Sequence, residues 1–572
     1  MARINKKMAA LLVLFVSVDS SLSSRNIDLG AATISTIDHD FVKTNSGVGV
    51  VNVTSALDSY ISTLDPVYNW EFVEGNNISF PRFGVDAVVL NVTSQQWLTT
   101  DHYEGPSGAV WTHQVAVTIP KNLKSTKTAL IVMTGGCNDQ PVKPVPKDEE
   151  YLALTADISG RTGLIGVVLY QIPNCHLVFA SDPDKKRRSE DGVMAWSWRE
   201  FLSSTEAEVN PELVINLPMA KAAFACMKAV NEFTGNEMEF VVSGASKRGW
   251  TSWLVGSAAN SDTCQWCPKV SGIAPLVPIV PYINHSVHLQ HQSLGGFTFA
   301  FADYKEAGFL DLWETSPQLD NFLEIVDPGH NALYQERLAA IPKLAVVSSD
   351  DEFMQLDWTA YKWTDLPGEM HLLVIPNSEH SLSTGIPTLL PAITAFAASI
   401  AANETSSERP IFTHSVDETT GAISVTVPDG APQPSKVVLR HAQTISKTRR
   451  DFRWVKLSNN STLPCTWPCI KLNSTYEGGG NCLQPILWDG QTLHPAQRRQ
   501  GNNSTTWSAT PAAPLPEHWR GYFIELYFRS DITPDSDLMV STPGYMWPNT
   551  LPFPDCQWYG PHADPNCSAS LV

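Results

Sequence analysis

The sequence has few positive charges for its length. Among 572 residues, 39 are lysine or arginine and 58 are aspartate or glutamate, which gives a formal net charge of −19. A chain with this excess of acid repels the phosphates of nucleic acids and the surfaces of anionic membranes. We therefore expect neither nucleic acid as a partner nor insertion into a membrane.

The sequence also lacks a long apolar run after its first residues. The stretch Met8–Val18 is mostly apolar, follows three positive residues, and is too short to span a bilayer. This pattern is typical of a secretory signal peptide, and the small residues Val18 and Ser20 suit a cleavage site, so we predict a signal peptide over residues 1–20. The final residues, PHADPNCSASLV, lack the apolar tail of a lipid-anchor signal.

Two other features indicate the secretory pathway. The ten cysteines are even in number, which suits an oxidising compartment. Eleven N-x-S/T sequons are potential glycosylation sites: Asn52, Asn77, Asn91, Asn284, Asn403, Asn459, Asn460, Asn473, Asn502, Asn503 and Asn566. We expect a secreted glycoprotein, or one in the lumen of the secretory–lysosomal pathway.

Motifs for the common cofactors are missing as well. The sequence contains no G-x-x-x-x-G-K-[ST] phosphate loop, no dinucleotide-binding fingerprint and no helix with metal-ligand spacing. The pair Cys264 and Cys267 lacks a second Cys/His pair, so structural cysteines are favoured over a zinc or redox site. We predict chemistry that needs no metal and no cofactor.

Short apolar runs alternate with helical stretches from about residue 80 to residue 400. Strands are predicted at residues 110–119, 129–134, 164–170, 240–242, 342–348 and 370–375, and helices at residues 218–234 and up to about 402. This alternation is typical of an α/β fold, in which a mostly parallel sheet carries helices on both faces.

The pattern of apolar and helical segments changes twice along the sequence. Residues 281–340 interrupt the alternation, and we interpret them as a cap-like insertion over the carboxyl edge of the sheet, where such folds bind ligands. After about residue 405, short alternating runs separated by Pro, Gly and Asn predict an all-β, sandwich-like domain. The predicted organisation is therefore a catalytic domain over residues 21–404 and a β-rich domain over residues 405–572.

The most informative segment is EFVVSGASKRGW, in which a buried strand leads directly into a helix. Ser246 would lie on the tight turn between them, with its Oγ exposed beside the N–H groups of the helix N-terminus. The usual motif is G-x-S-x-G, whereas Arg248 stands here at the second glycine position. Taken alone, the segment also fits a serine that caps an ordinary helix.

Two later strands end in residues that would complete a catalytic triad. One is followed by Asp350 and Asp351, and the next by His380, which is the nucleophile–acid–histidine order of α/β-hydrolases. The carboxylate would orient His380, which would accept the proton of Ser246 Oγ. Charge alone does not separate Asp350 from Asp351. Backbone N–H groups of Lys247 and of Gly136, in the glycine-rich loop after an earlier strand, would form an oxyanion hole.

Several segments resemble one protein family: SKRGWTSWL, RSEDGVMAWSW, LPMAKA, DDEF and PNSEH. They are similar to the PhoPQ-activated pathogenicity-related family, which includes autocrine proliferation repressor proteins, over roughly residues 50–400. The resemblance implies an α/β-hydrolase fold, and its Asp-Glu-Phe motif implies Asp351 as the triad acid. It also implies peptidase-like relatives and a signalling role in eukaryotes.

Together these observations predict a secreted serine hydrolase that cleaves a peptide or another amide or ester, with peptidase-like activity favoured. Carbohydrate or other ester hydrolysis is one alternative. A receptor-binding signalling ligand on a hydrolase scaffold is another, because an intact triad is compatible with both.

Two further predictions concern the edge of the active site. Glu190 and Asp191 could bind the α-amino group of a peptide; alternatively, one caps a helix and the other pairs with Arg188 or Arg199. Cys137 and Cys175 follow strands that are neighbours in the hydrolase strand order, so a disulfide is predicted between them.

Overall fold

The computed structural model describes residues 52–104, 108–138, 143–458, 470–476, 479–496 and 503–572. The predicted signal peptide, residues 1–20, lies outside this range, as do the sequons at Asn459, Asn460 and Asn502. All described residues belong to one unit, Val51–Val572.

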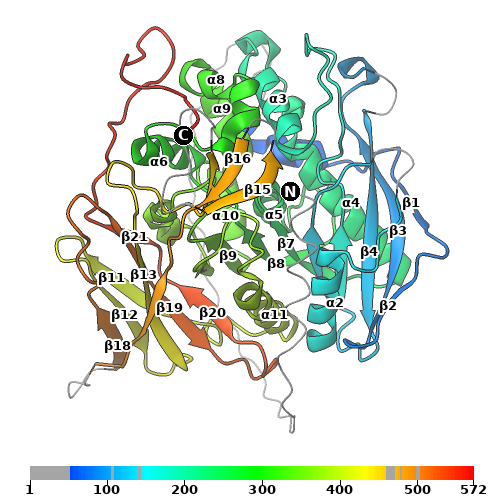
Figure 1. Cartoon of the computed structure of the whole chain (residues 1–572). Coiled ribbons are helices and arrows are strands. Elements are labelled where there is room, and N and C mark those ends of the chain that lie inside the picture. The colour runs from blue at the N-terminus through cyan, green and yellow to red at the C-terminus, as the bar shows by residue number, and fades with distance from the viewer. Residues whose placement is uncertain (1–51, 105–107, 139–142, 459–469, 477–478, 497–502) are drawn as a thin grey trace, which may run out of the picture. The chain divides into compact units, whose positions relative to one another are not determined.

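A large sheet runs through the first part of this unit, in the order β1-β3-β4-β6-β5-β7-β8-β9-β10, and β2 pairs with β3 (Figure 1). Its strands are β1 (Asn69–Phe72), β2 (Ile78–Phe80), β3 (Val85–Gln96), β4 (Val110–Pro120), β5 (Thr128–Met133), β6 (Ile165–Leu169), β7 (Glu239–Ala245), β8 (Val270–Leu276), β9 (Lys343–Ser348) and β10 (Met370–Ile375). The strands β5 to β10 pair in parallel, whereas β4 is antiparallel to both β3 and β6. This strand order establishes the predicted α/β-hydrolase fold.

The central strands form because their sequences are almost continuously apolar. Every residue of β6 and β9 is buried, as are five of the seven in β7. Strands covered on both faces need apolar, β-branched residues at every position, which is the pattern of these segments. All six strands predicted from sequence in this region are confirmed.

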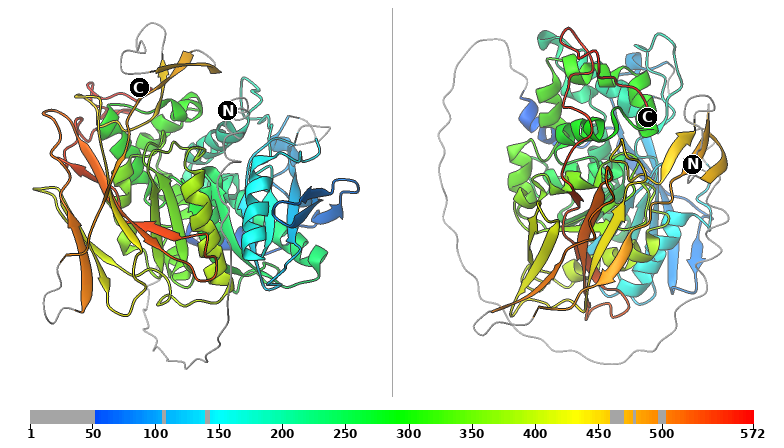
Figure 2. Two further views of the ribbon diagram at one scale, coloured as in Figure 1. Left: turned by 60° about the horizontal axis from the view of Figure 1, so that its bottom comes forward. Right: turned by 60° about the vertical axis from the view of Figure 1, so that its left-hand side comes forward.

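Helices cover both faces of the sheet (Figures 1 and 2). On one face, α2 (Glu150–Thr162) packs against β4 and β6, and α11 (Ile386–Ala401) against β5 and β8. On the other, α4 (Asn216–Thr234) packs against β3 and β4, and α5 (Lys247–Ser257) against β7 and β8. Gly235 adopts a left-handed conformation (φ 67°) and ends α4, as its position after the helical pattern predicts.

The predicted insertion, residues 281–340, is helical and connects β8 to β9. It contains α6 (Ile283–Leu294), α7 (Ala302–Glu306), α8 (Phe309–Thr315), α9 (Leu319–Val326) and α10 (Ala332–Leu338). The helices α7 and α8 contact α3 (Glu190–Leu202), which follows β6 and its loop. Several of these helices line the candidate site described below.

The chain after residue 404 forms an antiparallel β region. Its sheets are β11-β12-β18, β17-β13-β19-β20 with β21 on β19, and β14-β16-β15. The strands are β11 (Thr413–Asp417), β12 (Ala422–Pro428), β13 (Lys436–Gln443), β14 (Val455–Ser458), β15 (Ile470–Tyr476), β16 (Gly479–Leu483), β17 (Asp489–Thr492), β18 (Ser504–Ala509), β19 (Arg520–Phe528), β20 (Leu538–Ser541) and β21 (Tyr545–Trp547). Strand β20 packs on β10 and α11, and the N–H of Val374 donates to Ser541 Oγ at 2.9 Å. A domain boundary at residue 404 stays a prediction.

None of the helices in the described ranges is both long enough and apolar enough to cross a bilayer.

Candidate active site

Ser246 lies on a strained turn between β7 and α5. Its backbone has φ 62° and ψ −124°, a conformation that L-residues rarely adopt and that costs about 1–3 kcal/mol. Two hydrogen bonds hold it: the Ser246 N–H donates to the Leu276 carbonyl at 2.9 Å, and the Ser246 carbonyl accepts from Trp250 N–H at 3.0 Å. The turn therefore has the geometry of a nucleophile elbow.

The structure explains why an arginine can stand at the usual second glycine position. A side chain at Gly244 would put its Cβ 2.7 Å from Arg248 Cβ, so Gly244 makes room for the arginine. The close approach of α5 to β8 instead depends on Gly249, where a Cβ would lie 2.4 Å from the Leu276 carbonyl oxygen. The glycine that the helix–sheet contact requires has moved one position along the chain.

The structure brings Ser246, His380 and Asp351 into one chain of hydrogen bonds. Ser246 Oγ lies 2.8 Å from His380 Nε2, and both carboxylate oxygens of Asp351 lie 2.9 Å from His380 Nδ1. The three side chains come from the carboxyl ends of β7, β9 and β10, which meet at one edge of the sheet. This is the arrangement in which a carboxylate orients an imidazole that accepts a serine proton.

The two candidate acids have different surroundings. Asp351 accepts hydrogen bonds from the N–H groups of Phe353 (2.7 Å) and Met354 (3.3 Å) as well as contacting His380. Asp350 faces away from the histidine ring, and its carboxylate accepts from Ser349 Oγ at 2.6 Å and Trp488 Nε1 at 3.0 Å. The contact with His380 therefore belongs to Asp351.

A third acid, Glu352, is buried beside the same histidine. Its Oε2 accepts the backbone N–H of His380 at 2.9 Å. Burial, and then the negative charge of Asp351, raise the pKa of Glu352 to about 8. Burial also raises the pKa of Asp350 well above its ordinary range, against the donors Ser349 and Trp488. Burial therefore favours the protonated form of both acids that flank Asp351 in the chain.

The pKa of His380 results from opposing effects. Burial lowers it, but attraction and hydrogen bonding to Asp351, with a further contribution from Glu352, outweigh burial and leave the pKa raised. The positive charge of Lys247 acts in the lowering direction. A raised pKa makes the imidazole a stronger base, which suits proton transfer from a hydroxyl.

Glu190 and Asp191 lie at the N-terminus of α3 and pair with the two cations that follow Ser246. Arg248 Nη2 lies 2.7 and 2.5 Å from the Glu190 oxygens, and Lys247 Nζ lies 3.2 Å from Glu190 Oε2 and 3.1 Å from Asp191 Oδ2. The two cations lower the pKa of Glu190 to about 2 against the effect of burial, with Arg248 the stronger of the two.

These contacts correct the ion pairs expected from the sequence. Arg188 pairs with Asp182 at 2.8 Å, and Arg199 donates to the Ala307 carbonyl at 2.6 Å, so neither is the partner of Glu190 or Asp191. The pairing with Lys247 and Arg248 was missed because the two segments are far apart in the chain and no local spacing links them. A substrate amine would have to compete with these cations.

The glycine loop after β5 contacts this cluster. The Gly136 N–H donates to Glu190 Oε1 at 3.3 Å, so it is engaged with a carboxylate rather than free for a substrate oxygen. A Cβ at Gly135 would lie 2.3 Å from Arg248 Nη2, so only glycine allows the guanidinium to approach there. The Lys247 N–H is the first of α5 and belongs to the N–H groups that no helical carbonyl accepts. The oxyanion hole stays a prediction.

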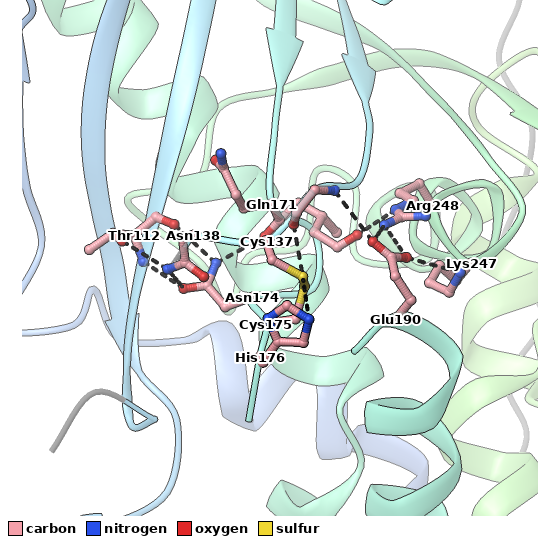
Figure 3. Close-up of a disulfide and its surroundings, with 12 residues drawn as sticks. Thr112, Cys137, Asn138, Gln171, Asn174, Cys175, His176, Glu190, Lys247 and Arg248 are labelled. Carbon is pink, nitrogen blue, oxygen red and sulfur yellow. Dashed lines mark hydrogen bonds and ion pairs between the residues drawn. A yellow bond between two sulfur atoms is a disulfide. The ribbon is translucent and has the colours of Figure 1, made fainter. Parts of the chain in front are cut away.

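A disulfide ties this glycine loop to the loop after β6 (Figure 3). Cys137 and Cys175 are bonded, with Cα atoms 4.6 Å apart, which confirms the predicted pair. Beside it, the Asn138 side chain donates to Asn174 Oδ1 at 2.9 Å, and the Asn138 N–H donates to the Cys175 carbonyl at 2.9 Å. Because β5 and β6 are adjacent and parallel, their carboxyl-end loops lie close enough to be cross-linked. Cys264 and Cys267 also form a disulfide.

A small apolar cavity of about 30 Å³ lies beside Ser246 and His380. By the usual requirement of roughly 10–15 Å³ per water, the cavity has room for about two water molecules. Its walls are mainly aromatic and aliphatic, with Asp191 and Lys247 at the polar side, and include Trp198, Trp250, Ile283, Phe301, Phe309 and Phe353. Within the described ranges, no group of three or more His, Cys, Asp or Glu could hold a metal ion.

The chain is similar to known proteins in sequence and in structure. Residues 57–453 match the family described as PhoPQ-activated pathogenicity-related protein. Autocrine proliferation repressor protein A of Dictyostelium discoideum is 33% identical over 526 residues, which cover 89% of this chain and 94% of the relative.

Solved structures of hydrolases also resemble the chain. An acetyl xylan esterase from Paenibacillus sp. R4 matches 60% of this chain and 92% of its own, with 12% identity and a TM-score of 0.37. An S-formylglutathione hydrolase from Agrobacterium tumefaciens matches 58% of this chain and 99% of its own, with 13% identity and a TM-score of 0.34.

The raised pKa of Glu352 predicts a pH-dependent effect of Glu352→Gln. In the unfolded chain Glu352 loses its proton near pH 4.3, whereas the folded protein keeps it to about pH 8, so its ionisation lowers stability progressively between these values. Glutamine does not titrate. The difference in Tm, variant minus wild type, should therefore rise from pH 5 to pH 8 and level off above. Thermal unfolding at constant ionic strength measures this difference in Tm. A difference that stays constant with pH would show that Glu352 is ionised in the folded protein.

Proposed function

This chain belongs to the PhoPQ-activated pathogenicity-related protein family, and on that premise we propose that it is a serine hydrolase that transfers an acyl group to water. The observation that carries the proposal is the unbroken hydrogen-bond chain from Asp351 through His380 to Ser246 Oγ. It lies at the carboxyl edge of a hydrolase-type sheet, on a strained elbow whose conformation costs free energy.

The proposed reaction has two halves. In the first, Ser246 Oγ attacks the carbonyl carbon while His380 Nε2 takes its proton, and the carbonyl oxygen becomes an oxyanion near the Lys247 N–H. His380 then gives the proton to the leaving alcohol or amine, and an acyl-serine remains. In the second half, His380 takes a proton from water, whose oxygen attacks the acyl carbon. His380 then returns this proton to Ser246 Oγ as the bond between Oγ and the acyl carbon breaks, which releases the acid and restores Ser246. Asp351 keeps the imidazole oriented and stabilises its charged form throughout.

The cavity beside Ser246 supports a small, uncharged acyl group as the substrate moiety. Its walls are apolar, and its only charged side chains besides His380, Asp191 and Lys247, already pair with each other. Together with Glu190 and Arg248 these two residues form a cluster of two negative and two positive charges. The cluster therefore attracts neither a substrate anion nor a substrate cation strongly. An ester or amide with a short acyl part fits these surroundings better than a peptide bound by its free α-amino group.

Action outside the cell, or in the secretory lumen, is the proposed setting. Three disulfides among the described residues, including Cys556–Cys567, support an oxidising compartment.

A second candidate function is signalling. It is supported by the relative in Dictyostelium discoideum that is named an autocrine proliferation repressor. In that case the chain would bind a cell-surface receptor, and acyl transfer would be secondary or lost. The Ser246→Ala protein separates the two functions. If this variant still represses cell proliferation, that effect does not depend on acyl transfer.

Covalent labelling tests the proposal directly. A fluorophosphonate probe should react with wild type, because Ser246 Oγ displaces fluoride from phosphorus while His380 takes the proton. Ser246→Ala should abolish labelling without lowering Tm. Ser252→Ala is the matched control, since this buried serine of α5 donates to the Arg248 carbonyl at 2.9 Å and should leave labelling intact. Wild type that stays unlabelled beside a reactive control hydrolase would contradict the proposal.

A second measurement decides between the uncharged-acyl and amine-bound substrates. We expect alanyl p-nitroanilide and its N-acetyl form to differ by less than about threefold in kcat/KM, because Lys247 and Arg248 already neutralise both carboxylates. If acetylation instead lowers kcat/KM more than about tenfold, and Asp191→Asn removes that difference, Asp191 binds the α-amino group and the enzyme is an exopeptidase.

A further inference from the structure

A tryptophan of the C-terminal β region touches both loops that carry the proposed triad residues. Trp488 lies just before β17 and is 2% exposed. Its indole Nε1–H donates to Asp350 Oδ1 at 3.0 Å, and Asp350 directly precedes Asp351. Its backbone exchanges two hydrogen bonds with the side chain of Asn377: Trp488 N–H donates to Oδ1 at 2.7 Å, and the Trp488 carbonyl accepts from Nδ2 at 3.1 Å.

The two loops are also bonded to each other at this point. The Asp350 N–H donates to the Ser378 carbonyl at 3.1 Å, and the Asn377 N–H donates to Ser349 Oγ at 3.0 Å. Ser349 Oγ in turn donates to Asp350 Oδ2. Trp488 therefore closes a ring of hydrogen bonds that joins the loop of Asp351 to the loop of His380, within three residues of each.

The β region holds the indole in a fixed position. Its ring packs between Phe452 and Phe523, with centroids 5.6 and 5.4 Å away. A side chain at Gly521 would come within 2.6 Å of the indole, so only glycine leaves space there for the ring. Neighbouring Trp454 adds a bond from its N–H to the Asp350 carbonyl at 3.3 Å. The position of Asp350 thus depends on residues more than a hundred positions later in the chain.

We propose that Trp488 is a positioning residue for the triad, and that the C-terminal β region is in this way a part of the active site. The hydrogen bonds of Trp488 go to Asp350 and Asn377 and not to Ser246 or His380. It acts through Asp350 and Asn377, which set the separation of the Asp351 carboxylate from the His380 ring. This inference rests on the proposed function, because its effect is seen in the rate of acyl transfer.

The test replaces the indole donor and keeps an aromatic ring. Trp488→Phe preserves packing between Phe452 and Phe523 but removes the Nε1–H bond to Asp350. We expect kcat for p-nitrophenyl acetate to fall by about tenfold or more with KM changed less than about twofold, since substrate binding is untouched. The acid limb of the kcat/KM profile should move to lower pH, because a looser contact with Asp351 raises the pKa of His380 less.

Trp519→Phe is the matched control. Trp519 is buried in the same β region, and its indole Nε1–H donates to the Thr550 carbonyl at 2.9 Å, away from both loops. This variant loses a comparable hydrogen bond, so it should show a similar loss of Tm but an unchanged kcat and pH profile. Equal kinetic effects in the two variants would mean that Trp488 is only structural.

A second variant approaches the same link from the histidine loop. Asn377 has φ 56°, a conformation that glycine adopts freely, so Asn377→Gly removes the bonds to Trp488 without backbone strain. It should lower kcat as Trp488→Phe does, and it decides the outcome if Trp488→Phe does not fold. If wild-type turnover requires Ser246 but kcat is unchanged in both Trp488→Phe and Asn377→Gly, this inference is overturned and the proposed function stands. Absence of Ser246-dependent turnover in wild type would overturn the proposed function and this inference together.

Discussion

The hydrogen bond between His380 Nδ1 and the Asp351 carboxylate is the interaction on which the candidate site depends. It fixes the ring so that Nε2 points at Ser246 Oγ, and it outweighs the burial that would otherwise lower the histidine pKa. Asp351 lies in the chain between two other acids, Asp350 and Glu352, and burial favours the protonated forms of these two neighbours. Of the three carboxyl groups, that of Asp351 is the one hydrogen-bonded to the imidazole.

Charged side chains are also paired with one another on the other side of Ser246. Two cations follow the serine directly. Lys247 opposes protonation of His380, and both cations would be costly to bury without a partner. Glu190 and Asp191, from the start of α3, neutralise both. The cluster also connects α5, α3 and the glycine loop, and the Cys137–Cys175 disulfide ties that loop to its neighbour. The two cations after Ser246 and the acids that pair with them thus join three segments around the candidate site.

Much of the fold, and two of the three candidate triad residues, followed from local patterns in the sequence. Continuous apolar runs predicted the strands, the switch to short alternating runs predicted the β region, and the chain order pointed to Ser246 and His380. Local patterns could not separate Asp350 from Asp351, since both follow the same strand and differ only in the direction of their side chains. The contacts of Glu190 with Arg248 and of Trp488 with Asp350 were also beyond reach. Each joins segments more than fifty residues apart, and their pairing exists only once the sheet order has brought the loops together.

The central claim is that an acyl group passes through Ser246 Oγ with His380 as the base. The most direct measurement mixes the protein with excess p-nitrophenyl acetate, quenches the reaction in acid, and determines the mass of each peptide. Our account predicts a burst of about one equivalent of p-nitrophenol per chain and a single acetyl group on the peptide that contains Ser246, both absent in His380→Ala. Turnover without an acetyl group on Ser246, or with the acetyl group on another residue, would contradict it.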